Sequence, residues 1–247
     1  MSRVTSSSTE TFDARILYRI GGVAAIAILT IYLIDLAVVI TAGLPPVTIE
    51  DWFSLFQSNV HLGLLKSFSL DILANIFHAP LFLGLFFSLR KNRKSFPALM
   101  LSTIFAFIGM AVYFASNTVF SLLYLSNRYA AASTDAQRTM FLTAGQAMLA
   151  IYNGTGPFMA FTLYAIAGLT VSLIMLKSHT FSKTTAYAGI VGNALQLGPP
   201  PGYGPDLFFK IDPILIGIGG VFLMVWLFLI AKQFFRLASI LSKEKTS

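Results

Sequence analysis

The stretch FSLDILANIFHAPLFLGLFFSLRKNRK, residues 68–94, joins a long apolar run to a dense cluster of basic residues. Its apolar part, residues 68–89, is long enough to cross a bilayer, which takes about 20 residues as an α-helix. A cluster of Lys and Arg directly after such a run is typical of the cytoplasmic end of a span. The stretch therefore predicts a transmembrane helix, and it places an aspartate, an asparagine and a histidine inside that helix.

The rest of the chain repeats this pattern. Of its 247 residues, 56% are hydrophobic and only 11% are charged, whereas a soluble domain carries about 25% charged residues. We therefore expect an all-α polytopic membrane protein with one transmembrane domain over residues 16–237. Its six predicted spans cover residues 16–42, 68–89, 96–125, 157–176, 181–197 and 213–235. A disordered cytoplasmic tail (residues 1–15) precedes the domain, and a basic cytoplasmic tail (residues 238–247) follows it.

The positions of the basic residues predict the orientation of these spans. With both termini in the cytoplasm, thirteen of the 17 Lys and Arg residues fall on the inner face. Only Lys66, Arg128, Arg138 and Lys210 then fall on the outer face. This asymmetry follows the positive-inside rule. It predicts a multi-pass protein of the cell (cytoplasmic) membrane with the N-in, C-in topology.

A polar segment on the predicted outer face, residues 48–66, follows a Pro-Pro turn. Thr48 is a suitable N-cap residue, and apolar residues recur after it at helical spacing. The segment is too polar to span a bilayer, so it predicts a short amphipathic helix at the membrane interface. Trp52 is expected at the depth of the lipid headgroups.

A second polar segment on that face covers residues 134–151. Thr134 and Gln137 have the spacing of a capping box at the start of a helix. One side of this helix is apolar and is expected to pack on the outer end of the bundle: Met140, Phe141, Ala144, Met148 and Ile151. The segment predicts a second amphipathic helix that covers the bundle, with gating of a cavity as the alternative to simple packing.

Three stretches resemble a known family. The most distinctive is LSNRYAAASTDAQRTMFLTAGQAMLAIYN, residues 125–153, and SKTTAYAGIVGNALQLG, residues 182–198, adds to it. Residues 71–95 are similar to the family's second helix in a less specific way. Together they resemble the DUF4386 family of prokaryotic membrane proteins over residues 16–235. The resemblance implies a six-helix membrane fold and carries no activity, cofactor or site residue.

The predicted second span holds the best candidate site. Asp71, Asn75 and His78 are spaced i, i+4 and i+7, which puts them on one face of a helix. Ionisable side chains inside a span usually face the bundle interior. The outer half of the bundle also receives Asp35, Asn117 and Asn193 from other spans. These six residues predict an outward-facing polar cavity that binds a ligand, unless they only form hydrogen bonds between helices.

Several chemistries find no support in the sequence. The chain has no cysteine and only three histidines, which share no helix face, so a metal site is not expected. No phosphate-binding, dinucleotide-binding or catalytic motif is present, and the sequence names no cofactor. The basic residues flank apolar runs and do not form a separate patch, which argues against nucleic acid as a partner.

Three functions remain after these exclusions. The first is a non-enzymatic membrane protein that binds or senses a small ligand in the outward-facing cavity. The second is an intramembrane enzyme that uses His78 with Asp35 and Asp71. The third is an accessory subunit of a membrane complex. The lipid bilayer is a partner in each case, and a homo-oligomer or a partner membrane protein fits the third.

Overall fold

The computed structural model describes residues 14–90, 93–198 and 206–244, and these residues are helical apart from short connections. The predicted tail over residues 1–15 lies almost entirely outside this part of the chain. The helices are α1 (Ala14–Ala42), α2 (Ile49–Ser58), α3 (Val60–Lys66), α4 (Asp71–Leu89), the short 3₁₀ turn η1 (Arg93–Ser95), α5 (Phe96–Ser116), α6 (Val119–Ala130), α7 (Asp135–Tyr152), α8 (Thr155–Leu176), α9 (Lys183–Leu195) and α10 (Asp206–Glu244).

Six of these helices form a closed ring. Going round it, α1 packs on α4, α4 on α5, α5 on α8, α8 on α9, α9 on α10, and α10 returns to α1. The order of the helices around the ring is therefore their order in the chain. The core of the ring is apolar and is built from the buried stripe of each helix. In α1 this stripe recurs at three- and four-residue spacing and includes Ile28, Ile31 and Asp35.

Five helical segments of the described chain are long and apolar enough to cross a membrane. They contain α1, α4, α5, α8 and α10, and they agree with five of the six predicted spans. The remaining prediction, residues 181–197, corresponds to α9. This helix has 13 residues and is about 20 Å long at 1.5 Å per residue, which is shorter than the ~30 Å hydrocarbon core.

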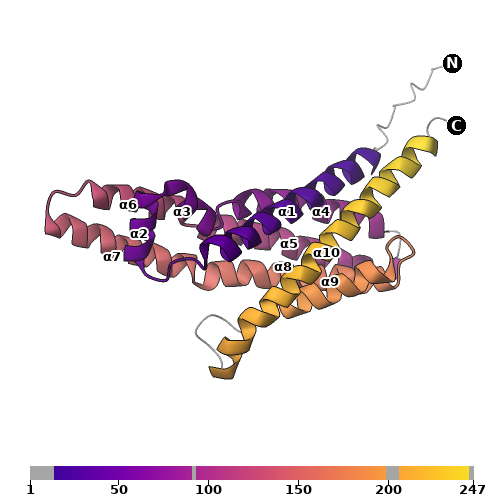
Figure 1. The fold of residues 1–247 in the computed structure, drawn as a ribbon. Helices are drawn as coiled ribbons and strands as arrows, with labels where there is room; N and C mark the ends of the chain where they lie inside the picture. The colour runs from indigo at the N-terminus through magenta and orange to yellow at the C-terminus, as the bar shows by residue number, and fades with distance from the viewer. Residues whose placement is uncertain (1–13, 91–92, 199–205, 245–247) are drawn as a thin grey trace, which may run out of the picture.

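Two of the predicted spans differ from the helices that form. The span over residues 96–125 is interrupted, because α5 ends at Ser116 and α6 begins at Val119. The side chain of Asn117 accepts a hydrogen bond from the backbone N–H of Val119 (3.2 Å), which stabilises the break. Beyond it, α6 and α7 form a helical hairpin that projects from the ring (Figure 1).

The segment over residues 48–66 does not form one surface helix. It divides at Asn59 into α2 and α3, and α2 packs across α6 and α7 (Figure 1). Thr48 caps α2, as predicted. Trp52, which was predicted at headgroup depth, is only 1% exposed and belongs to a second apolar core with residues of α2, α6 and α7. Tertiary packing thus gives the Trp52 ring a protein environment.

The predicted helix over residues 134–151 is α7, and its predicted packing side is correct only in part, since Met148 packs on the second apolar core whereas Met140 and Ile151 are exposed. Met140 is 56% exposed, and the residues buried in α7 are Gly145 and Leu149. The absence of a side chain at Gly145 lets α2 approach closely, since a Cβ there would lie 2.7 Å from atoms of Ile49 and Phe53. The predicted Thr134 cap is present, and Gln137 accepts a hydrogen bond from the N–H of Ser133.

The first and last helices of the ring are antiparallel. Tyr18, near the start of α1, stacks on Phe234, near the end of α10, with ring centroids 5.8 Å apart. Phe234 is fully buried and fills a notch between Gly21 of α1 and Gly84 of α4. The start of α1 and the end of α10 therefore lie at the same end of the molecule (Figure 1), and α10 remains helical through residues 238–244.

Candidate functional site

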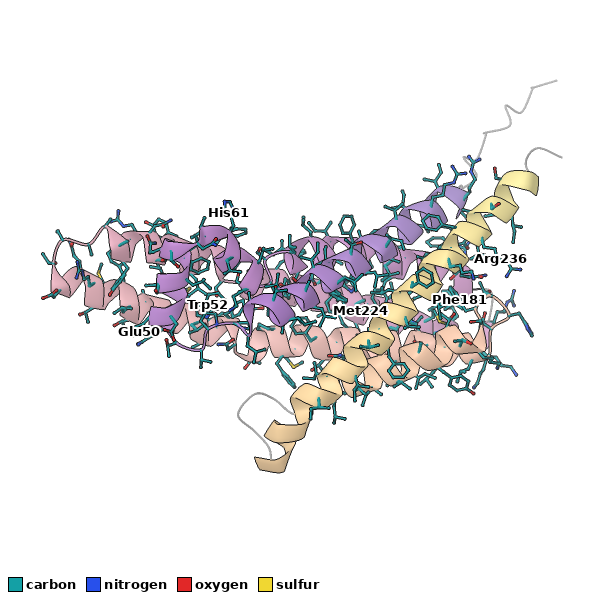
Figure 2. The ribbon with its side chains drawn as sticks, in the orientation of Figure 1. Glu50, Trp52, His61, Phe181, Met224 and Arg236 are labelled. Carbon is teal, nitrogen blue, oxygen red and sulfur yellow. The ribbon has the colours of Figure 1, made fainter. Side chains whose placement is uncertain are left out.

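A cavity of about 300 Å³ lies inside the ring of helices. We call it the central cavity. Residues of α1, α4, α8, α9 and α10 line it, together with the connection between α3 and α4. Figure 2 labels Met224 on the part of α10 that lines this cavity. The lining is mostly aromatic and aliphatic, with a small group of polar side chains: Asp35, Asp71, Asn75, His78, Asn193 and Gln196.

Helix α4 presents three of its polar residues, Asp71, Asn75 and His78, to the central cavity. The side-chain amide of Asn75 donates to the backbone carbonyl of Asp71 (2.8 Å), and its Oδ1 accepts a bond from the Tyr164 hydroxyl (2.6 Å). The Nδ1 of His78 lies 2.7 Å from the carbonyl oxygen of Ala74. A carbonyl can only accept, so Nδ1 carries a proton and donates it to Ala74.

Two acidic residues meet at this cavity from different helices. The carboxyl groups of Asp35 and Asp71 lie within hydrogen-bonding reach of each other. The Oδ1 atom of each is buried, and no described residue donates a hydrogen bond to it. Two carboxyl oxygens approach this closely only when a proton or another cation lies between them. The pair is therefore a centre of negative charge in an apolar surrounding.

Asn193 reaches the central cavity from α9. Its Nδ2 donates to the carbonyl of Gly189 (2.7 Å), which leaves Oδ1 as an acceptor. Its side chain occupies the space beside Gly168 of α8, where any Cβ would overlap with it. Gly168 therefore lets α8 and α9 come close enough for Asn193 to reach the cavity. The neighbouring Gln196 donates to the carbonyl of Ile216 on α10 (3.2 Å).

A second cavity, of about 490 Å³, adjoins the first on the side of the α7–α8 junction. The two share four lining residues: Phe68, Asp71, Phe161 and Gln196. Asn117 lines this second cavity, where its Nδ2 donates to the hydroxyl of Tyr113 (3.1 Å). Phe68 adopts a positive φ of 50°, an uncommon and strained backbone conformation for a large residue.

The structure brings five of the six predicted site residues to one cavity. Asp35, Asp71, Asn75, His78 and Asn193 line the central cavity, whereas Asn117 lines only the adjoining one. The aromatic part of the site was missed: Tyr32, Phe68, Phe82, Phe161, Tyr164 and Trp226. With 14% aromatic residues in the chain, composition alone cannot separate cavity-lining rings from rings that face lipid or core.

The arrangement suits binding better than metal chemistry. Among the described residues, no group of three His, Cys, Asp or Glu side chains is placed to hold a metal ion. His61 is exposed in α3 (Figure 2), and His179 is exposed in the α8–α9 connection. What remains is an apolar cavity with a few convergent polar groups, which is the usual form of a small-molecule site.

No family model, curated protein sequence or solved structure matches this chain.

Proposed function

We propose that this chain is an integral protein of the cell membrane that binds a small molecule in the central cavity. In this proposal α9 completes a sixth crossing, both termini are cytoplasmic, and the adjoining cavity opens toward the outer face. The resemblance to the DUF4386 family is part of the proposal and rests on residues 125–153. Binding, rather than catalysis, is proposed because no metal cluster or catalytic motif accompanies the cavity in the described chain.

Two observations support the topology. The antiparallel packing of α1 and α10 puts the start of α1 and the end of α10 on the same side of the molecule, as an even number of crossings requires. Basic residues also gather at that end: Arg90 directly follows α4, Lys177 directly follows α8, and Arg236 lies near the end of α10. Gln233 of α10 donates to the carbonyl of Thr180, and Thr180 donates to that of Ser88. These bonds tie the ends of α4 and α8 to α10. Figure 2 labels Arg236 at this end and Glu50 at the opposite end.

The binding proposal rests on the carboxyl group of Asp35, which is buried and incompletely hydrogen-bonded. Its side chain is only 8% exposed, lines the central cavity, and has an unpartnered buried oxygen. A buried polar atom without a hydrogen-bond partner is costly, and an ionisable residue inside a span that faces a cavity is typical of a functional site. A molecule in the cavity would supply the missing partner.

Cysteine labelling tests whether the central cavity admits small molecules. The chain has no cysteine of its own. Gly220 lines the cavity, and a Cβ added there meets no atom within 4 Å, so Gly220→Cys fits without a clash. Gly217 has the same open space on the same helix but does not line either cavity. It provides a matched control.

The reagent is 2-hydroxyethyl methanethiosulfonate, which is neutral and water-soluble, applied to protein in lipid nanodiscs. Thiols react as thiolates, so a cysteine in a wet cavity reacts faster than one that faces lipid. We expect Gly220→Cys to react at least about tenfold faster than Gly217→Cys. Equal rates, with Ala136→Cys on the exposed surface of α7 reacting normally, would refute an accessible cavity.

A further inference from the structure

The central cavity offers hydrogen-bond acceptors and few donors. Several of its donors are already used: the side-chain amides of Asn75, Asn193 and Gln196 donate to backbone carbonyls, and the Tyr164 hydroxyl donates to Asn75. The Tyr32 hydroxyl also lines the cavity and can either donate or accept. The indole N–H of Trp226 is buried and unpartnered, but it lies against Gly189 of α9.

Three hydrogen-bond acceptors of the cavity, in contrast, lack a donor. Asp35 and Asp71 each keep a buried oxygen with no donor, and the Oδ1 of Asn193 has no donor among its described bonds. The residues that line the cavity in the described part of the chain include no lysine and no arginine. A ligand that complements this surface must donate hydrogen bonds and carry positive charge.

The remaining lining tells which kind of cation fits. Six aromatic rings border the cavity: Tyr32, Phe68, Phe82, Phe161, Tyr164 and Trp226. Aromatic faces attract cations through their quadrupole and also provide apolar contact area. A hydrated inorganic cation would find too few oxygen ligands here, since Ca²⁺ takes six to eight. The volume of about 300 Å³ lies at the lower end of small-molecule pockets.

We propose that the ligand is a small protonated amine with an apolar, ring-sized body. This inference rests on the proposed function above and names the ligand class of the same cavity. The ammonium group lies between the carboxyl groups of Asp35 and Asp71, in the place of the proton that otherwise holds the pair together. The apolar body lies among the aromatic rings, in contact with Phe161 and Tyr164 of α8 and with Trp226 of α10.

Protection of Gly220→Cys from the neutral thiol reagent tests this ligand class. Three probes share one ring and nearly one length: 2-phenylethylamine is a cation at neutral pH, 2-phenylethanol is neutral, and 3-phenylpropionate is an anion. We expect the amine to slow labelling at a concentration at least about tenfold below that of the alcohol, because charge-assisted bonds are stronger than neutral ones. The anion is expected to give no protection.

A second variant separates the carboxylates from the rings. In the Gly220→Cys background, the double substitution Asp35→Asn and Asp71→Asn removes both carboxyl groups, and with them the negative charge of the pair, and keeps the shape of the side chains. We expect labelling to persist and the tenfold preference for the amine over the alcohol to disappear. Circular dichroism and size-exclusion chromatography of the same sample check that the variant is folded.

The outcomes distinguish the two proposals. If Gly220→Cys does not react in the absence of probe, the accessible cavity fails and the ligand class fails with it. If it reacts but the alcohol or the anion protects as well as the amine, the ligand class is overturned and the cavity stands. The same holds if no probe protects at millimolar concentration, or if the amine preference survives in the double variant.

Discussion

Tyr164 of α8 donates a 2.6 Å hydrogen bond to the Oδ1 of Asn75 on α4, across the wall of the central cavity. Asn75 is 3% exposed, and its amide nitrogen is bonded to the carbonyl of Asp71. The bond from Tyr164 therefore fixes the orientation of the Asn75 side chain, one helical turn after Asp71. Helices α4 and α8 are not neighbours in the ring of strong contacts, so this bond is one of few links between them.

Tyr164→Phe is expected to lower the free energy of unfolding by about 0.5–2 kcal/mol, because the buried Oδ1 of Asn75 loses its donor. Thermal unfolding in a mild detergent measures the change. Tyr187→Phe is the control, since Tyr187 on α9 is 59% exposed and should tolerate the substitution. If both variants unfold at the wild-type temperature, the Tyr164–Asn75 bond does not stabilise the fold.

Asp35→Asn is expected to raise the stability of the ligand-free protein by about 1 kcal/mol. An asparagine can donate its amide to the Asp71 carboxyl, so the pair no longer needs a proton or cation between its two carboxyl groups. Gains of this kind are common where a functional residue is kept at a cost in stability. The midpoint of thermal unfolding at neutral pH reports it. Glu50→Gln, at an exposed site in α2, should leave that midpoint unchanged. A lower midpoint for Asp35→Asn would argue that the carboxyl is well partnered.

Phe234→Ala is expected to destabilise the ring by about 3–5 kcal/mol, the usual range for a buried Phe. Its ring fills the notch between Gly21 and Gly84, so α1, α4 and α10 all lose contacts at once. The neighbouring Phe235 is 42% exposed, and Phe235→Ala should cost much less. Detergent unfolding curves of the two variants give the comparison. Similar losses for both would show that α10 does not depend on this contact.

Two single cysteines test the proposed topology. Ala136 is exposed in the first turn of α7, and His179 is exposed in the connection after α8. With both termini inside, a membrane-impermeant maleimide added to intact cells should label Ala136→Cys and should label His179→Cys only after permeabilisation. The reverse result would invert the orientation. Labelling of both residues in intact cells would contradict a crossing between the two positions.

Much of the fold follows from local sequence properties. The positions of α1, α4, α8 and α10 are visible as apolar runs, because every span must satisfy its own backbone in the bilayer and cover about 30 Å with apolar side chains. The caps at Thr48 and Thr134 were also predicted, since a cap depends on residues only three positions apart. The predicted Asp71–Asn75–His78 face needs only the helical period.

Other features depend on contacts between distant segments, which no local pattern encodes. The burial of Trp52 requires α6 and α7 to form a hairpin. The apolar stripe of α7 gave only part of its packing side, because a pattern of hydrophobic residues does not mark Gly145, where α2 approaches. Gly219 of α10 allows a close approach to α9, whereas Gly217 and Gly220 face open space.

The sequence by itself determined that this is an α-helical membrane protein and which of its polar side chains lie inside the apolar spans. Length, hydropathy and charge position suffice for that, because the bilayer imposes the same constraint on each span separately. Only the tertiary structure decided that Asp35 meets Asp71 and that aromatic rings surround the pair. The pairing of the two carboxyl groups depends on the packing of α1 on α4, and the aromatic wall also needs α10, which supplies Trp226 and packs on α1 at the other end of the chain. The geometry of this packing is set by side-chain contacts and by the glycines that allow it.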